Sequence, residues 1–308
     1  MAKPFTTAAR TVDTYRAILV TIEEAGVQGR GEARGIPLNG ETPTQLMAAI
    51  EAVRDDIEGG ISRSELQKLL PIGGARNAVD CALFDLEARL KGISPWELAD
   101  VKPGPVTTVY TVSHDTLDAM VQDAKAHSLF TYLKIKISGP QDSERIAAIR
   151  AVRPHARLII DANQSLSKET LPDFVRQLKA LDVTMLEQPV PLGEDGFLEG
   201  FNSPIPLYAD ESINNRSALR DVTQRYAGIN IKLDKTGGIT EALALLNEAR
   251  KANLGIMIGN MLGTSLAMAP AMLLARQADL VDLDGPLLLA NDPEDLLTFD
   301  GPYISPNF

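Results

Sequence analysis

The sequence predicts an α/β protein whose larger part is a parallel barrel of the TIM type. From Val106 onward, eight short apolar segments alternate with amphipathic helical segments. A closed parallel sheet surrounded by helices is the simplest fold that such alternation builds. The first 103 residues follow another order, with two strands ahead of several helices. The turn-rich stretch DVKPGP separates the two parts, so we expect domains at 1–103 and 104–289.

The N-terminal part is expected to be a hairpin followed by helices. Residues 14–33, TYRAILVTIEEAGVQGRGEA, place strand-forming residues on both sides of a turn at Gly26. Helical segments follow at 42–60, 62–70 and 75–92. We expect the C-terminal segment 290–308 to join this first domain.

The barrel strands are expected where short apolar runs recur. In order along the chain these are residues 106–112, 132–137, 157–162, 183–188, 206–211, 228–233, 254–259 and 280–285. Helical segments such as 142–153, 168–181 and 239–253 lie between most of them. All strands of a parallel barrel end at one mouth, so residues far apart in the sequence meet there.

Composition indicates a globular cytoplasmic protein without nucleic-acid or membrane partners. The 308 residues are 44% hydrophobic and 23% charged, which suits a sizeable buried core. The net charge of −11 disfavours binding to nucleic acid or to an anionic membrane. The N-terminus lacks the apolar core of a signal peptide. Cys81 is the single cysteine, which excludes an internal disulfide and a cysteine-rich metal site.

Charged and polar side chains stand at the carboxyl ends of the expected strands. In chain order they are Lys134, Lys136, Asp161, Asn163, Glu187, Asp210, Glu211, Lys235, Asp282 and Asp284. The intervals are 23 to 26 residues between successive members of the series Lys136, Asp161, Glu187, Asp210 and Lys235. This is the length of one strand, one helix and two loops. A solvated surface would scatter its charges. The register therefore indicates a functional site at the barrel mouth.

Three carboxylates on consecutive strands form a site of hard oxygen ligands: Asp161, Glu187 and Asp210. Mg²⁺ suits this site, because the ion accepts two or three carboxylates and keeps positions for water or substrate. Each acid alone is as well explained by a helix cap or a salt bridge. Three in register favour the metal.

Two lysines flank the three acids. Lys136 ends the second strand and Lys235 the sixth, so they face each other across the mouth with the metal between them. A lysine acts as a base only if its pKa falls from about 10.4 toward neutrality. A neighbouring ammonium and a divalent cation both lower the pKa, so we expect Lys134 to depress that of Lys136. The alternative is that the lysines neutralise the acids in structural ion pairs.

The chain resembles the muconate lactonizing enzyme subgroup of the enolase superfamily. The motifs LKIK, DANQS, LEQP, ADES and IKLDKTGG match it in order and spacing, and the resemblance extends from about Lys3 to Pro286. It implies a modified (β/α)7β barrel with an α+β capping domain. It also implies Mg²⁺ ligands at Asp161, Glu187 and Asp210, acid/base catalysts at Lys136 and Lys235, and supporting roles for Asn163, Glu211 and Lys232.

The chemistry implied by the resemblance is removal of a proton α to a carboxylate. Mg²⁺ bound to both carboxylate oxygens stabilises the enediolate that forms. One lysine takes the proton from one face, and the other returns a proton to the opposite face. Two bases indicate racemisation or epimerisation, since a dehydratase or cycloisomerase needs only one.

The Asp-x-Asp pair of the eighth strand points to the substrate. Asp282 and Asp284 share one face by the period of two and are suited to a substrate ammonium group. Dipeptide epimerases of the subgroup carry this pair and use it for the free N-terminus of the dipeptide. We expect the pair to lie across the mouth from the metal ligands. The alternative is that these acids cap the barrel bottom or pair with Arg276.

Further residues are expected to contact the substrate. Residues 3–14, KPFTTAARTVDT, resemble the mobile cap loop of dipeptide epimerases, in which Arg10 matches an arginine that meets a substrate carboxylate. Met261 and Thr264, in GNMLGTS after the seventh strand, are expected to line the pocket. Lys134 is expected to bind the substrate as well. The alternative for Arg10 is an arginine exposed to solvent, and the alternative for the residues of GNMLGTS is apolar packing.

The combined prediction is a Mg²⁺-dependent dipeptide epimerase with a small-molecule substrate of the L-Ala-D/L-Glu type. N-acylamino acid racemases and o-succinylbenzoate synthases share the metal and the lysines, but their substrates have no free ammonium for Asp282 and Asp284. A Schiff-base aldolase barrel or a non-enzymatic binding protein is the alternative from a different class. The metal-type acids disfavour both. A homo-oligomeric assembly stays open.

Overall fold

The computed structural model describes residues 1–308 except residues 3 and 8–10. The strands are β1 Phe5–Thr6, β2 Thr11–Val12, β3 Ile18–Glu24, β4 Val27–Ala33, β5 Val106–Thr107, β6 Tyr110–Val112, β7 Tyr132–Lys136, β8 Arg157–Asp161, β9 Val183–Glu187, β10 Leu207–Ala209, β11 Gly228–Ile231, β12 Gly255–Ile258, β13 Leu280–Val281, β14 Leu297–Asp300 and β15 Tyr303–Pro306. The α-helices are α1 Pro43–Glu51, α2 Arg54–Glu58, α3 Arg63–Leu69, α4 Gly74–Lys91, α5 Pro95–Leu98, α6 Leu117–Ala126, α7 Ser143–Val152, α8 Leu171–Ala180, α9 Leu219–Arg225, α10 Leu233–Thr236, α11 Ile239–Lys251 and α12 Ser265–Ala275.

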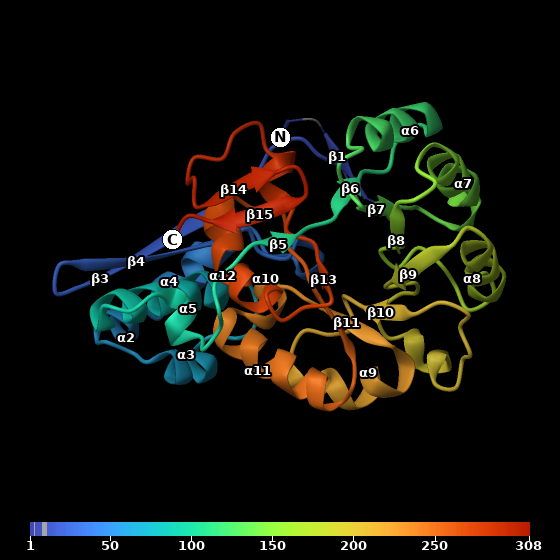
Figure 1. Ribbon diagram of the computed structural model, residues 1–308. Coiled ribbons are helices and arrows are strands. Elements are labelled where there is room, and N and C mark those ends of the chain that lie inside the picture. Colours follow the sequence, from blue (N-terminus) through green and yellow to red (C-terminus); the bar gives the residue numbers. More distant parts are fainter. Residues whose placement is uncertain (3, 8–10) are drawn as a thin grey trace.

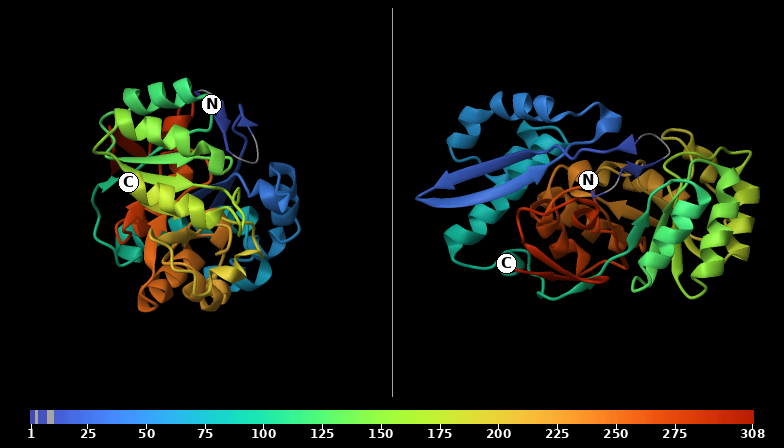
Figure 2. Two further views of the ribbon diagram at one scale, coloured as in Figure 1. Left: turned by 90° about the vertical axis from the view of Figure 1, so that its right-hand side faces the viewer. Right: turned by 90° about the horizontal axis from the view of Figure 1, so that it is seen from above.

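A barrel and a smaller α+β unit lie side by side. Strands β6–β13 with the helices around them form the barrel (Figure 1). The long hairpin β3–β4 and helices α1–α5 form the second unit, which Figure 2 shows beside the barrel when the molecule is seen from above. None of the described helices has both the length and the apolar character that crossing a membrane requires. The predicted α/β fold with an N-terminal α+β part is confirmed.

The N-terminal unit is built on a tightly packed hairpin. Strands β3 and β4 pair antiparallel over their whole length through a turn at Ala25 and Gly26, which confirms the predicted hairpin. Helix α4 packs on β4 at glycine distance, because a methyl group at Gly31 would overlap the backbone oxygen of Ala78. This close approach fixes α4 between the hairpin and the barrel.

The barrel sheet is parallel, with neighbouring strands in the order β6 to β13 along the chain. The ring closes between its first and last strands, where the Val109 N–H donates to the Val281 carbonyl oxygen at 2.9 Å. Helices follow most strands and cover the outside of the ring (Figure 1). The carboxyl ends of all these strands therefore surround one mouth.

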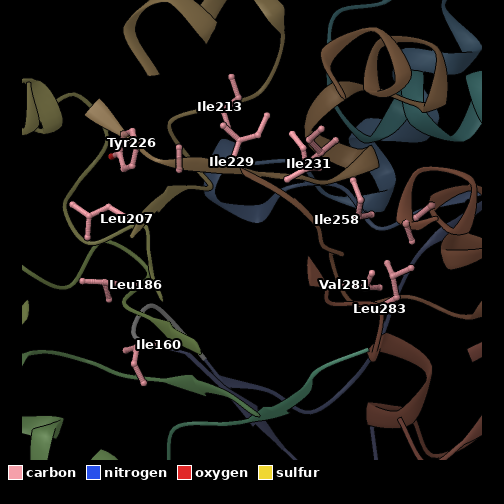
Figure 3. Packing of buried hydrophobic residues seen from close by; sticks show 14 of the residues in the cluster. Ile160, Leu186, Leu207, Ile213, Tyr226, Ile229, Ile231, Ile258, Val281 and Leu283 are labelled. Carbon is pink, nitrogen blue, oxygen red and sulfur yellow. The ribbon is translucent and has the colours of Figure 1, made fainter. Parts of the chain in front are cut away.

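Side chains inside the barrel form two layers. The layer nearer the amino ends of the strands is an apolar cluster of Val109, Ile159, Met185 and Met257. Asp161 and Glu187 stand two residues further along β8 and β9, so they share the inward face. The residues between, such as Ile160 and Leu186, belong to the outer core that packs against the helices (Figure 3). Because side chains alternate along the strands, the carboxylates lie next to this apolar cluster, which forms an apolar floor below the mouth.

The first predicted barrel strand, 106–112, is split in two. β6 pairs with β7 in the barrel, whereas β5 pairs with β15 in a separate three-stranded sheet. The C-terminal segment 290–308 therefore pairs with β5 rather than with the hairpin β3–β4. It also touches the hairpin, since Arg30 Nη1 lies 2.8 Å from Glu294 Oε2. The domain boundaries at 103 and 289 stay a prediction.

Gly31→Ala is expected to destabilise the protein, because the added methyl group must push α4 away from β4. The free energy of unfolding should fall by about 2 kcal/mol or more, as in other overpacked cores. Denaturant titration measures this difference. Gly196→Ala is the matched control, since no atom lies within 4 Å of a methyl group at that position. Equal stability of the two variants would contradict the close packing of α4.

Candidate active site

A cavity of about 350 Å³ opens at the carboxyl ends of the barrel strands. Its charged barrel residues are Lys134, Lys136, Asp210, Glu211, Lys232, Lys235, Asp282 and Asp284. The N-terminal unit closes one side with residues that include Phe5, Val12, Arg34, Ile36 and Leu38. Strands β1 and β2 are fastened to the end of β6, since the Thr6 N–H donates to Ser113 Oγ at 2.9 Å. A ligand in the cavity therefore meets both units.

The three predicted metal ligands converge at this mouth. The pairing register sets Lys136 beside Asp161 and Asp161 beside Glu187, and Asp210 follows β10 directly. One carboxylate oxygen of each acid lies within 4.8 Å of the other two, and all three acids are buried. Like charges this close repel strongly in a buried site, so the cluster requires compensating cations.

Lys136 and Lys235 lie at opposite ends of the row of acids. Lys136 Nζ is 2.6 Å from Asp161 Oδ2, and Lys235 Nζ is 2.6 Å from Asp210 Oδ1. Both lysines are buried and both line the cavity. Each end of the row of carboxylates thus has at least one ammonium group beside the cavity.

Lys134 lies in the middle of the cluster. Its Nζ is 3.0 Å from Asp161 Oδ2, 2.8 Å from Glu187 Oε2 and 2.8 Å from Asp282 Oδ2. The expectation that Asp282 lies across the mouth from the metal ligands is therefore wrong, because one ammonium group joins it to two of them. Burial alone would lower the pKa of Lys134, but the three carboxylates outweigh burial and hold the pKa well above its ordinary value.

Burial and neighbouring charges set the protonation of the other groups. Burial and the Lys232 ammonium lower the pKa of Lys235 against the attraction of Asp210. Burial and the Asp161 carboxylate raise the pKa of Glu187 to about 7. In spite of burial, Lys232 and Lys235 hold the pKa of Asp210 well below its usual range. A lysine with a lowered pKa beside the cavity is suited to accept a proton.

Two carboxylate oxygens of the cluster accept no hydrogen bond from the described residues. Glu187 Oε2 and Asp210 Oδ1 have only ion-pair contacts, with Lys134 and Lys235 respectively. The other Glu187 oxygen accepts a hydrogen bond from Asn230 Nδ2 at 2.7 Å. Buried oxygens are normally hydrogen-bonded. Carboxylate oxygens on adjacent acids that have ion-pair contacts but no hydrogen bond fit a hard divalent cation, which takes carboxylate oxygens as ligands.

The three residues predicted to support the site lie around it. Asn163 Oδ1 accepts a hydrogen bond from Lys136 Nζ at 3.2 Å, and Lys232 Nζ donates to Asp210 Oδ2 at 2.6 Å. Glu211 lines the cavity, and burial together with the Asp210 charge raises its pKa to about 7. Asn163 and Lys232 thus contact a lysine or an acid of the site directly, whereas Glu211 interacts with Asp210 through its charge.

Asn230 and Gln188 hold the acids in place, and sequence patterns singled out neither. Asn230 stands two residues before Lys232, so the period of two along β11 would have placed it on the mouth side. Gln188 Oε1 accepts the backbone N–H groups of Asp210 and Ser212 at 2.9 and 3.1 Å, which fixes the turn after β10. A side chain that binds backbone groups of another loop leaves no periodic trace in the sequence.

Lys235 does not stand on a strand. The predicted strand 228–233 ends early at β11, and the short helix α10 carries Lys235. Arg76 of α4 donates from Nη2 to the Thr236 carbonyl at 2.7 Å and from Nε to the Gly237 carbonyl at 3.0 Å. The N-terminal unit therefore holds the turn on which this lysine sits.

Asp282 and Asp284 reach the cavity with different partners. Asp282 Oδ2 accepts from Lys134, while its Oδ1 accepts no hydrogen bond from the part of the chain that the structure describes. Asp284 Oδ2 accepts the Thr111 N–H at 2.7 Å, and burial together with Asp282 raises the pKa of Asp284 to about 7. Arg276 instead donates to backbone carbonyls outside the mouth. Asp282 Oδ1 is thus an acceptor left for a ligand.

The remaining predicted contacts have different outcomes. Met261 lines the cavity. Thr264 is buried and donates its hydroxyl to Glu32 Oε2 at 2.6 Å, so this group joins α12 to β4 and is not available for a ligand. Arg10 lies outside the described residues.

Family models match both units of the chain. The N-terminal domain of mandelate racemase / muconate lactonizing enzyme matches residues 1–99, and an enolase C-terminal domain-like model matches residues 116–290. The L-Ala-D/L-Glu epimerase of Escherichia coli (strain K12) is 44% identical over 299 residues, which cover 96% of this chain and 93% of that protein. An N-acetyl-D-glutamate racemase from Pseudoalteromonas sp. is 44% identical over 243 residues, 79% of this chain and 77% of that protein.

Solved structures share the fold over both units. An enolase family member from Agrobacterium tumefaciens with homology to dipeptide epimerases, solved with sodium and L-Ala-L-Glu, has a TM-score of 0.97 and 40% identity over 99% of this chain and 94% of that one. A dipeptide epimerase from Methylococcus capsulatus, complexed with Mg and L-Arg-D-Lys, has a TM-score of 0.91 and 27% identity over 99% of this chain and 93% of that one.

Asp210→Asn is expected to weaken divalent-cation binding, because it removes one of three charges that face the cation and leaves two lysines without their counter-ion. The Kd for Mg²⁺ should rise by about 100-fold or more. Isothermal titration calorimetry measures the change, and Asp173→Asn on the exposed face of α8 is the control. A variant that binds Mg²⁺ as tightly as the parent protein would show that the cluster is not the metal site.

Proposed function

The chain belongs to the mandelate racemase/muconate lactonizing enzyme family of the enolase superfamily, and we propose that it is a Mg²⁺-dependent dipeptide epimerase. Its reaction inverts the α-carbon of the C-terminal residue of a dipeptide, with L-Ala-D/L-Glu as the first substrate type. Support comes from the E. coli epimerase, which matches nearly the whole chain, and from the L-Ala-L-Glu bound to the A. tumefaciens protein.

The observation that carries the proposal is the placement of two buried lysines on either side of the acids. Lys136 contacts Asp161 at one end of the row, and Lys235 contacts Asp210 at the other. Both line the same cavity. Two bases that approach one carbon from opposite sides suit a transfer in which a proton leaves one face and another arrives at the opposite face.

We propose Asp161, Glu187 and Asp210 as the residues that hold Mg²⁺. Their converging oxygens and the two that accept no hydrogen bond among the described residues fit this hard cation. Bound there, Mg²⁺ supplies positive charge that stabilises the substrate carboxylate as the α-proton leaves. The Lys134 ammonium, already 3.0 Å from Asp161 and 2.8 Å from Glu187, adds a second positive charge for the same carboxylate.

The two lysines then move the protons. Burial lowers the pKa of Lys235. A larger fraction of this lysine is therefore the neutral amine, which can accept a proton, than in an exposed lysine. In one direction Lys235 Nζ takes the α-proton and the Lys136 ammonium delivers a proton to the other face. In the reverse direction the two lysines exchange these roles, so both epimers are converted.

The Asp282 and Asp284 pair is proposed to bind the free ammonium of the dipeptide. Asp282 lines the cavity, and its buried Oδ1 accepts no hydrogen bond from the described residues. A substrate ammonium at this oxygen would form a charge-assisted hydrogen bond, which is stronger than a neutral one. The same ammonium would favour the ionised form of Asp284, whose pKa near 7 otherwise leaves it partly protonated.

A racemase of N-acylamino acids is the second candidate. The N-acetyl-D-glutamate racemase is as similar in sequence as the E. coli epimerase, although over a smaller share of the chain. Lys134 already neutralises one oxygen of Asp282, and burial together with Asp282 raises the pKa of Asp284 to about 7. Such a pair tolerates a neutral amide better than two free carboxylates would. A cytoplasmic location and a homo-oligomeric state stay predictions for either activity.

Comparing a dipeptide with an N-acylated amino acid separates the two candidates. We expect L-Ala-L-Glu to have a kcat/KM at least about 100-fold above that of N-acetyl-L-Glu, because the acetyl compound has no ammonium for Asp282. Epimer formation in the presence of Mg²⁺ is followed by polarimetry or proton NMR. Asp284→Asn should narrow the preference and leave Mg²⁺ binding intact.

The opposite ranking assigns the chain to the N-acylamino acid racemases and rejects the dipeptide proposal. Conversion of neither compound in the presence of Mg²⁺, with the protein folded, rejects both candidates. An Asp284→Asn variant that keeps the full preference removes that residue from ammonium recognition.

A further inference from the structure

Arg34 is a cation in the cavity wall that has no hydrogen-bond or ion-pair partner among the described residues. It follows directly after β4 and lines the cavity from the side of the N-terminal unit. Its side chain is half-buried, yet it makes no hydrogen bond and no ion pair within the described part of the chain. Burial lowers the pKa of this guanidinium, which means that its charge is incompletely compensated. A guanidinium in such a place is suited to an anionic ligand.

The other basic residues of the cavity differ from Arg34 in this respect. They are Lys134, Lys136, Lys232 and Lys235, and each contacts a carboxylate at 3.0 Å or less. Within the described residues, Arg34 is therefore the one cavity cation that forms no ion pair with a carboxylate. A ligand anion that reaches it does not have to displace a protein carboxylate.

The carboxylate of Asp234 raises the pKa of Arg34 against burial, but it forms no ion pair with the guanidinium among the described residues. Glu32 accepts the Tyr15 hydroxyl at 2.5 Å and the Thr264 hydroxyl at 2.6 Å. Asp234, which precedes Lys235, accepts the Gly35 N–H at 3.1 Å. These contacts fix the backbone on both sides of Arg34 and hold it close to the turn of Lys235. The wall position is thus rigid, while the guanidinium itself stays available.

We propose that Arg34 binds the side-chain carboxylate of an acidic substrate and so sets a preference for glutamate at the residue that is epimerised. The inference rests on the proposed function, in which a bound Mg²⁺ and Lys134 would hold the α-carboxylate of the substrate. A second carboxylate on the same substrate needs a second cation, and a guanidinium binds a carboxylate through two parallel hydrogen bonds. The role holds equally for a dipeptide and for an N-acylglutamate, since both carry this side chain.

The test compares L-Ala-L-Glu with L-Ala-L-Gln, which has the same shape without the charge. For Arg34→Gln we expect the Kd and KM for L-Ala-L-Glu to rise by about 10- to 100-fold, the loss of one charge-assisted contact. Values for L-Ala-L-Gln should change by less than about threefold, because no charge is lost from that contact. Calorimetry gives the Kd and epimerisation gives kcat and KM. N-acetyl-L-Glu and N-acetyl-L-Gln form a second pair for the racemase alternative.

Two further variants make the result specific. Arg34→Lys keeps the positive charge and should retain part of the preference for glutamate. Arg16→Gln makes the same substitution at an exposed arginine of the same unit and should leave both ligands unaffected. Because Arg34 has no ion pair in the described residues, Arg34→Gln should also unfold at the parent temperature, which thermal denaturation checks.

Failure of this inference differs from failure of the proposed function. If Arg34→Gln keeps the preference for glutamate, or loses affinity for both ligands of a pair equally, Arg34 does not read the side chain. Loss of the preference in Arg10→Gln alone would give that role to Arg10. Binding that discriminates glutamate through Arg34 without any α-proton turnover would support the inference and reject the proposed reaction.

Discussion

Neutralisation of buried carboxylates by buried lysines is the interaction on which the barrel mouth depends. The acids are Asp161, Glu187, Asp210 and Asp282, and the lysines that contact them are Lys134, Lys136, Lys232 and Lys235. Removing one partner of a buried ion pair costs about 3–5 kcal/mol, because the other charge stays uncompensated. The sequence posed ion pairing and catalysis as alternatives for the lysines. In the structure these contacts are ion pairs, and under the proposed function the same contacts also hold the amines in place for proton transfer.

This neutralisation holds only if the strands keep their register. A shift of β8 by one residue would turn Asp161 into the outer apolar core and bring Ile160 into the mouth. The apolar floor of Ile159 and Met185 opposes such a shift, since both would leave the cluster that they fill. The N-terminal unit completes the arrangement, because Arg76 of α4 holds the turn that carries Lys235. Stability and chemistry at the mouth therefore depend on both units.

Residues that follow strand periodicity were predictable, and residues set by long-range contacts were not. Equal spacing along the chain placed Asp161, Glu187 and Asp210 together, because each ends one βα unit of a parallel barrel. The contact of Lys134 with Asp282 depends on closure of the ring between its first and last strands, which no local pattern records. Thr264 was misread for a similar reason: its partner Glu32 comes from the other unit. Arg34 was overlooked because the sequence shows neither that this arginine lines the cavity nor that it forms no ion pair among the described residues.

If each lysine serves one face of the α-carbon, a variant that lacks one lysine should still exchange the α-proton with solvent on the face that the other lysine serves. The most direct measurement is proton NMR of L-Ala-L-Glu and L-Ala-D-Glu in D₂O with Mg²⁺ and either Lys136→Ala or Lys235→Ala. Each variant is predicted to exchange the α-proton of one epimer only, a different epimer for each, while epimerisation falls by about 1,000-fold or more. Exchange of both epimers by one variant, or of the same epimer by both variants, would contradict the assignment of one lysine to each face.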